Sequence, residues 1–111
     1  PPDPTAPVVL LVEDNHDTRV IFGIVLRRAG YAVVEAHDGE QALALVRERR
    51  PDVVLLDIAL PGMDGWEVAR RLRADARTAD LPIVALTAHA LPAHRERSHL
   101  AGCDGHLTKP I

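Results

Sequence analysis

Several short apolar runs in this sequence are each followed by a side chain that could bind a metal or take part in phosphoryl chemistry. These side chains are Glu13, Asp14, Asp57, Thr87 and Lys109. Carboxylates that lie a few ångströms apart stay ionised together only beside a cation. A set of oxygen ligands suits Mg²⁺ better than Zn²⁺, which prefers His or Cys. If the fold brings these residues together, the pattern therefore predicts a magnesium site.

Lys109 stands out because it is the single lysine among the 13 basic residues of the chain. The lysine ammonium is a compact charge with three donors, which suits phosphoryl oxygens. Its position directly after the last apolar run favours a role in the predicted site over a role as a surface charge.

The apolar runs alternate with segments of helical periodicity. Strands are predicted for residues 8–12, 31–35, 53–56, 83–86 and 106–108, and helices for residues 17–29, 38–50, 64–75 and 92–101. Strands that alternate with helices and consist largely of Val and Leu are typical of a parallel sheet with helices on both faces. The predicted fold class is therefore α/β. The carboxyl ends of such strands lie at one edge of the sheet, so the five polar residues are expected to converge there.

Two of the predicted helices differ in their apolar faces. The helix at 17–29 carries Val20, Ile21, Ile24 and Val25 on one face, the pattern of a helix that packs on a core. The helix at 92–101 has little apolar face, so it is expected to be the least firmly held. The chain ends three residues after the last predicted strand, so no fifth helix is expected in it. Leu107 and neighbouring residues of the first strand are expected to lie partly open.

Length and composition limit the remaining possibilities. The 111 residues, 47% of them hydrophobic, fit one domain at residues 8–111 after an extended, proline-rich lead-in at residues 1–7. The net charge of -3 argues against direct binding to nucleic acid. The longest apolar run, residues 20–26, is far shorter than the roughly 20 residues of a membrane helix. With one cysteine and no leader pattern, the cytoplasm is the expected location.

The motifs at the strand ends resemble those of the receiver domain of bacterial two-component response regulators. The matching elements are Glu13-Asp14, the stretch from Leu55 through Asp57 to Gly65, Thr87-Ala88 and Lys109-Pro110. The resemblance covers residues 8–111 and implies a flavodoxin-like sheet of five parallel strands in the order 2-1-3-4-5. It also implies a phosphoaccepting signalling domain, which assists its own phosphorylation and dephosphorylation, and not an enzyme. Hybrid kinases and phosphorelays contain receivers of similar sequence.

The resemblance implies a role for each site residue. Asp57 is the phosphoacceptor, to which a sensor histidine kinase or a phosphotransfer protein passes a phosphoryl group from phosphohistidine. Asp14 and Asp57 bind Mg²⁺ directly, Glu13 binds it through water, and the backbone carbonyl of Ala59 completes the set. Lys109 and Thr87 contact the phosphoryl oxygens. Phosphorylation then changes the conformation read by a downstream effector protein or fused domain, and a homodimer is a further candidate assembly.

The sequence departs from the family pattern at His106, where most receivers have Tyr or Phe. Imidazole is smaller and titrates near neutrality. Two interpretations stay open, a switch residue that moves together with Thr87 and a solvent-facing strand residue without a role. The resemblance further implies that Ala59 and His89 occupy positions that control access of water to the acyl phosphate.

Two other functions fit the sequence less well. A phosphatase of the haloacid dehalogenase type also uses Asp, Lys and Mg²⁺, but it needs a second Asp two residues after the nucleophile, where this chain has Ala59. A flavin or nucleotide domain of similar topology needs small residues with free N–H groups after the first strand. Glu13 and Asp14 would repel phosphate there.

Overall fold

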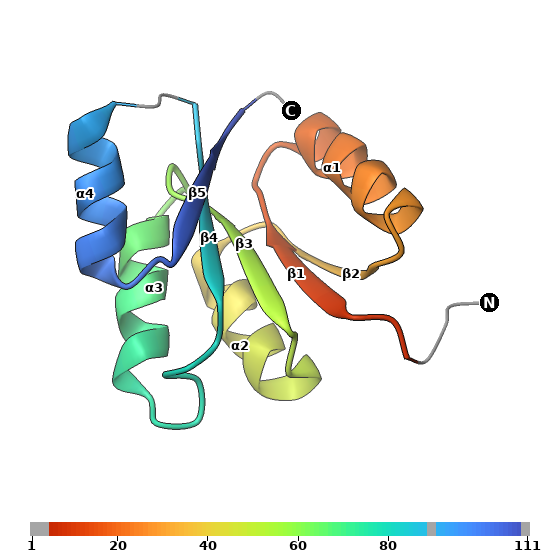
Figure 1. The fold of residues 1–111 in the computed structure, drawn as a ribbon, viewed down its shortest axis with the longest axis horizontal. Coiled ribbons are helices and arrows are strands. Elements are labelled where there is room, and N and C mark those ends of the chain that lie inside the picture. Colours follow the sequence, from red (N-terminus) through yellow and green to blue (C-terminus); the bar gives the residue numbers. More distant parts are fainter. Residues whose placement is uncertain (1–4, 89–90, 110–111) are drawn as a thin grey trace.

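A parallel sheet of five strands, in the order β2-β1-β3-β4-β5, forms the centre of the computed structural model, which describes residues 5–88 and 91–109 (Figure 1). The strands are β1 (Val8–Val12), β2 (Ala32–Ala36), β3 (Val53–Asp57), β4 (Ile83–Thr87) and β5 (Gly105–Thr108). The helices are α1 (His16–Arg28), α2 (Gly39–Arg49), α3 (Gly65–Ala74) and α4 (Pro92–Ala101). The predicted fold class and strand order are confirmed.

The sheet separates two apolar cores. On one face, α2, α3 and α4 pack on side chains such as Leu10 of β1 and Leu56 of β3. On the other face, Phe22 of α1 packs on Leu11 and Leu55. Alternate residues of one strand serve opposite faces, because successive side chains of a strand point to opposite sides. The central strands are consequently buried on both faces, which explains their continuous Val and Leu runs.

Polar side chains fix where the helices begin. The carboxylates of Asp38 and Asp64 accept hydrogen bonds from the backbone N–H groups of Gln41 (2.7 Å) and Glu67 (2.9 Å). Such caps satisfy N–H groups that lack partners within the helix. The helix starts predicted at these two aspartates are confirmed.

The predicted buried face of α1 was wrong. Val20, Ile21, Ile24 and Val25 are between 41% and 59% exposed, whereas Phe22 is 3% exposed. The four residues do share one face of the helix, but that face turns away from the sheet, and α1 contacts the core through Phe22 and the half-buried Leu26. Helical periodicity identifies an apolar stripe, but it does not say what covers the stripe.

The open position predicted for Leu107 is confirmed, since this side chain of β5 is 44% exposed. The matching prediction for β1 was wrong, because Val9 and Leu11 are almost completely buried. The reason is the position of α1, whose Phe22 lies in the same core as Val9 and Leu11.

Trp66 of α3 contacts α4, and Arg73 Nε of α3 donates to the carbonyl of Gly102 at the end of α4 (2.9 Å). The indole Nε1–H of Trp66 donates to Ser98 Oγ (2.9 Å), and the guanidinium of Arg97 lies 4.0 Å from the centre of the ring. Ser98 and Ala101 are the buried residues of α4. The weak attachment predicted for this helix stays a prediction. Over the residues described, every helix is too short or too polar to cross a membrane.

Adjacent residues of α1 test which face of this helix stabilises the fold. Phe22→Ala removes a buried ring and should lower the free energy of unfolding by about 3–5 kcal/mol. Ile21→Ala removes an exposed side chain and should change it by less than about 0.5 kcal/mol. Urea unfolding followed by circular dichroism measures both. Equal losses for the two variants would contradict the observed orientation of α1.

Candidate functional site

Backbone hydrogen bonds just beyond the strands place the predicted site residues. The N–H of Glu13 donates to the carbonyl of Ala36 (3.0 Å), and the N–H of Lys109 donates to the carbonyl of Thr87 (2.7 Å). These bonds extend the pairing of β1 with β2 and of β5 with β4 by one step. Glu13 and Lys109 are therefore fixed at the same edge of the sheet as Asp57, which ends β3.

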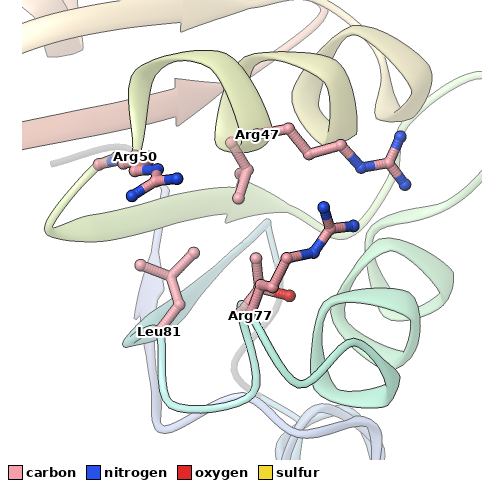
Figure 2. A pocket seen from close by; sticks show the side chains of 7 residues that line it. Arg47, Arg50, Arg77 and Leu81 are labelled. Atoms are coloured by element: carbon pink, nitrogen blue, oxygen red, sulfur yellow. The ribbon is translucent and has the colours of Figure 1, made fainter.

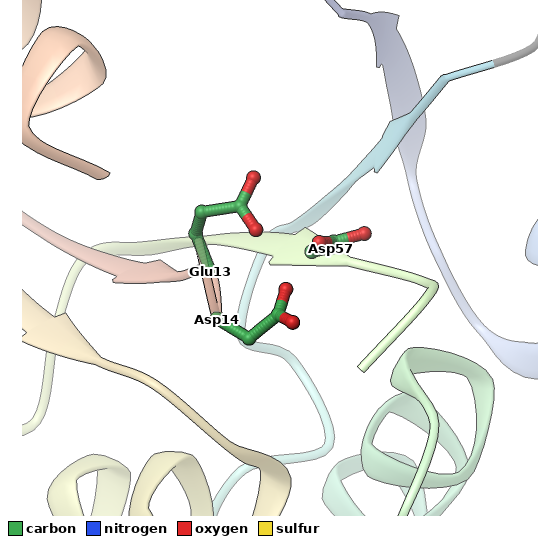
Figure 3. A group of neighbouring side chains, drawn as sticks. All are labelled: Glu13, Asp14 and Asp57. Carbon is green, nitrogen blue, oxygen red and sulfur yellow. The ribbon is translucent and has the colours of Figure 1, made fainter. Parts of the chain in front are cut away.

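The three acidic residues come together as predicted. Glu13, Asp14 and Asp57 each offer one carboxylate oxygen, and these oxygens lie within 4.8 Å of one another (Figure 3). Glu13 and Asp57 are buried, whereas Asp14 is exposed and leaves the cluster open to solvent. The donor set consists of oxygen atoms only and is open to solvent at Asp14, which fits the coordination by protein oxygens and water that Mg²⁺ prefers.

Lys109 joins the two buried carboxylates. Its Nζ lies 2.7 Å from Glu13 Oε1 and 3.2 Å from Asp57 Oδ2. Burial by itself lowers the Lys109 pKa, but the hydrogen bond to Glu13 and the attraction of Asp57 outweigh this effect and raise it. The ammonium therefore stays charged at the base of the site.

Glu13 is the strongly perturbed acid of the cluster. Burial and a hydrogen bond with Asp57 raise its pKa from 4.5 to about 7, against the opposing effect of Lys109. Repulsion from the charge of Asp57 acts in the same direction as burial. Two neighbouring carboxylates share a single nearby ammonium, so one of them holds its proton more tightly. An added cation would relieve this competition.

The loop after β3 orients Asp57. The N–H of Ala59 donates to Asp57 Oδ1 (2.9 Å), which leaves Oδ2 on the side of Lys109. Gly65, the first residue of α3, packs against this loop so closely that an added Cβ would lie 2.6 Å from Ile58 Cα. A glycine is therefore required at this position. The contact described for Ala59 uses its N–H, and its carbonyl as a metal ligand stays a prediction.

Thr87 lies beside the site, whereas His106 faces another part of the molecule. Thr87 is buried at the end of β4 and pairs in register with Thr108, next to Lys109. His106 is half-buried and lines a cavity of about 120 Å³ together with His99 and Cys103. It therefore faces α4 and the turn before β5. His89 lies outside the described residues.

Arg19 supports the site, although its sequence position gave no sign of this. Its guanidinium Nη1 donates to the carbonyl of Glu13 (2.8 Å), and its Nε lies 3.4 Å from Glu35 Oε1. Arg19 thus holds the backbone of the acidic pair against α1 and β2. In the sequence it is one of twelve arginines on predicted helices and loops, and the contact depends on tertiary placement alone.

The family model described as the response regulator receiver domain matches residues 9–111. The chain belongs to this family. The resemblance derived from the strand-end motifs is therefore confirmed.

Known receiver proteins agree with this assignment. The polar-differentiation response regulator DivK of Brucella anthropi is 38% identical over 103 residues, which cover 93% of this chain and 84% of DivK. The phosphate regulon regulatory protein PhoB of Pseudomonas aeruginosa is 40% identical over 103 residues, or 93% of this chain. The chain spans 45% of the length of PhoB.

A solved receiver structure has a similar fold. The receiver domain of the sensor histidine kinase PA1611 from Pseudomonas aeruginosa superposes with a TM-score of 0.88 at 38% identity, covering 96% of this chain and 88% of the other. That domain has a magnesium ion coordinated in its active site cleft. Receiver domains are signalling modules of response regulators and of some histidine kinases.

The raised pKa of Glu13 predicts a pH dependence of stability in the absence of Mg²⁺. Between pH 4.5 and about 7 the folded protein holds a proton on Glu13 that the unfolded chain has released. The folded state then binds more protons, so this residue makes the free energy of unfolding fall as the pH rises through that window. Glu13→Gln should remove the fall, whereas the control Glu96→Gln, on the exposed side of α4, should retain it. Denaturant unfolding at a series of pH values measures the slopes, and equal slopes in all three proteins would contradict the assignment.

Proposed function

We propose that the receiver domain accepts a phosphoryl group on Asp57 from the phosphohistidine of a sensor histidine kinase or a phosphotransfer protein, in a reaction that depends on Mg²⁺. The observation that carries the proposal is the buried Asp57 carboxylate, held between the Lys109 ammonium (3.2 Å) and the N–H of Ala59 (2.9 Å). These donors orient the carboxylate, and the cluster opens to solvent at Asp14.

In the proposed transfer, an Asp57 carboxylate oxygen attacks phosphorus and forms the new P–O bond. The P–N bond breaks, its electron pair returns to the imidazole, and the imidazole takes up a proton. Lys109 turns from Asp57 Oδ2 toward the phosphoryl oxygens, where its charge stabilises the transition state. The Thr87 hydroxyl, at the end of the neighbouring strand, donates to another phosphoryl oxygen.

The acidic cluster fits the metal that this reaction needs. Asp14 and Asp57 would bind Mg²⁺ directly, Glu13 would act through water, and the carbonyl of Ala59 would complete the protein ligands. The bound ion supplies charge neutralisation of the phosphoryl oxygens. The magnesium in the similar PA1611 receiver supports this part of the proposal.

We further propose that phosphorylation shifts the domain between two conformations that a downstream effector protein or fused domain distinguishes. Thr87 and His106 are the proposed switch residues, because both lie on the strands next to α4. The domain assists its own phosphorylation and dephosphorylation without acting as an enzyme on other substrates. The proposed partners exclude nucleic acid and membranes, a second copy of the chain is a further candidate, and the proposed location is the cytoplasm.

Chemical phosphorylation tests the acceptor. Phosphoramidate with Mg²⁺ should add one phosphoryl group to the wild-type chain, because it supplies the same P–N bond as phosphohistidine. Asp57→Asn should remain unmodified, and the control Asp17→Asn, an exposed residue of α1, should react like the wild type. Intact-mass spectrometry reads the result. An unmodified wild-type protein, or equal labelling of Asp57→Asn, would refute the proposal.

Magnesium titration tests the ligand assignment separately. Asp14→Ala removes a direct ligand and should weaken binding by roughly 100-fold, whereas Glu13→Gln removes a water-mediated one and should cost roughly tenfold. The amide proton of Ala59, which is hydrogen-bonded to Asp57 Oδ1, reports binding through its NMR chemical shift. If Asp14→Ala binds Mg²⁺ as tightly as the wild type, the metal lies elsewhere.

A further inference from the structure

A cavity of about 370 Å³ lies far from the phosphoacceptor, between the C-terminal end of α2 and the segment that leads from α3 to β4 (Figure 2). Pro51 and Leu81 line it, shortly before β3 and β4 begin at Val53 and Ile83. It is therefore at the amino ends of the strands, whereas Asp57 ends β3 at the opposite edge of the sheet. We propose that this cavity binds a small organic anion with a carboxylate or phosphate head group on an apolar body.

The charged residues that line the cavity are all cationic. They are Arg47, Arg50 and Arg77, and Figure 2 shows them approaching from both walls, two from the end of α2 and one from the opposite segment. Arg77 is paired with Asp75 (2.9 Å). Within the described residues, the guanidinium groups of Arg47 and Arg50 make no ion pair, although the charge of Asp75 also attracts Arg47, so one carboxylate faces three guanidinium groups. The cavity thus retains an excess of positive charge, and planar guanidinium groups match carboxylate and phosphate oxygens in pairs.

Arg50 occupies a backbone conformation that disfavours its side chain. Its φ is 46°, and among the described residues it is the one residue other than glycine with a positive φ. Arg50 directly follows α2 as its C-terminal cap, a position at which glycine would avoid the steric strain of an L side chain. Strained residues concentrate at binding sites. A guanidinium placed at the cavity in spite of this strain supports a ligand contact.

Apolar side chains from both walls, Val46 of α2 and Leu81 of the opposite segment, also line the cavity. Val46 is 3% exposed and Leu81 half-buried, and both pack in the main core. The segment that carries Leu81 is fixed by Arg73, whose Nη1 donates to the carbonyls of Ala79 (3.0 Å) and Leu81 (2.5 Å). A cavity of this volume falls within the range of about 300–1,000 Å³ typical of small-molecule sites. Its arginines would hold the anionic head group, and Val46 and Leu81 would contact the apolar body.

The test uses three probes that share one ring, namely phenylphosphonate, benzoate and the uncharged benzamide. None of them transfers a phosphoryl group, and omission of Mg²⁺ keeps the acidic cluster at Asp57 unfavourable to anions. NMR titration of the whole chain follows the backbone amides of Val46 and Thr78. The variants are Arg47→Gln, Arg50→Gly, which also relieves the backbone strain, and the control Arg49→Gln, which lies on the same turn outside the cavity.

The proposal predicts saturable shifts at both amides with phenylphosphonate or benzoate, at dissociation constants on the order of 1 mM or below. The tighter of the two identifies the preferred head group. Arg47→Gln and Arg50→Gly should each weaken binding by roughly tenfold while Arg49→Gln does not, and Arg50→Gly should melt no lower than the wild type. Absence of saturation, equal binding of benzamide, or equal losses in Arg49→Gln and Arg47→Gln would overturn the proposal. None of these outcomes depends on the phosphorylation of Asp57.

Discussion

Two buried carboxylates depend on one ammonium. Glu13 and Asp57 lie at the ends of adjacent strands, and Lys109 contacts both, at 2.7 and 3.2 Å. Without Lys109 the site would contain buried like charges with no compensation, a strongly unfavourable arrangement. The pairing still leaves Glu13 with a pKa of about 7. The site is thus short of positive charge, which accounts both for its suitability for Mg²⁺ and for the attraction between Lys109 and the carboxylate proposed as nucleophile.

Much of the fold follows from the sequence because the carboxyl ends of parallel strands converge by geometry. The strands were predicted to within one residue at each end, and the caps at Asp38 and Asp64 and the strand order implied by the family motifs were predicted correctly. The orientation of α1 was not. Its apolar stripe at Ile21 and its neighbours looks like a core face, but the packing is made by Phe22 on the adjacent side. Periodicity along one helix contains no information about which side meets the sheet.

The candidate site was predicted for a similar reason, since each residue follows a strand that must end at that edge. The supporting contacts were missed because they join residues with no pattern in the sequence. Arg19 of α1 donates a hydrogen bond to the carbonyl of Glu13, and Gly65 allows α3 to approach the end of β3. The cavity at Arg47 and Arg77 is formed by segments about thirty residues apart in the sequence. Their proximity in the fold depends on packing that local sequence patterns do not describe.

The relation between Lys109 and its two carboxylates is tested most directly by a crystal structure of the chain with Mg²⁺ and beryllofluoride, a stable mimic of an acyl phosphate. The account predicts beryllium bonded to an Asp57 carboxylate oxygen and the Lys109 ammonium within hydrogen-bond distance of a fluoride. Beryllofluoride on another carboxylate, or Lys109 still bound to both Glu13 and Asp57 with no fluoride contact, would contradict it.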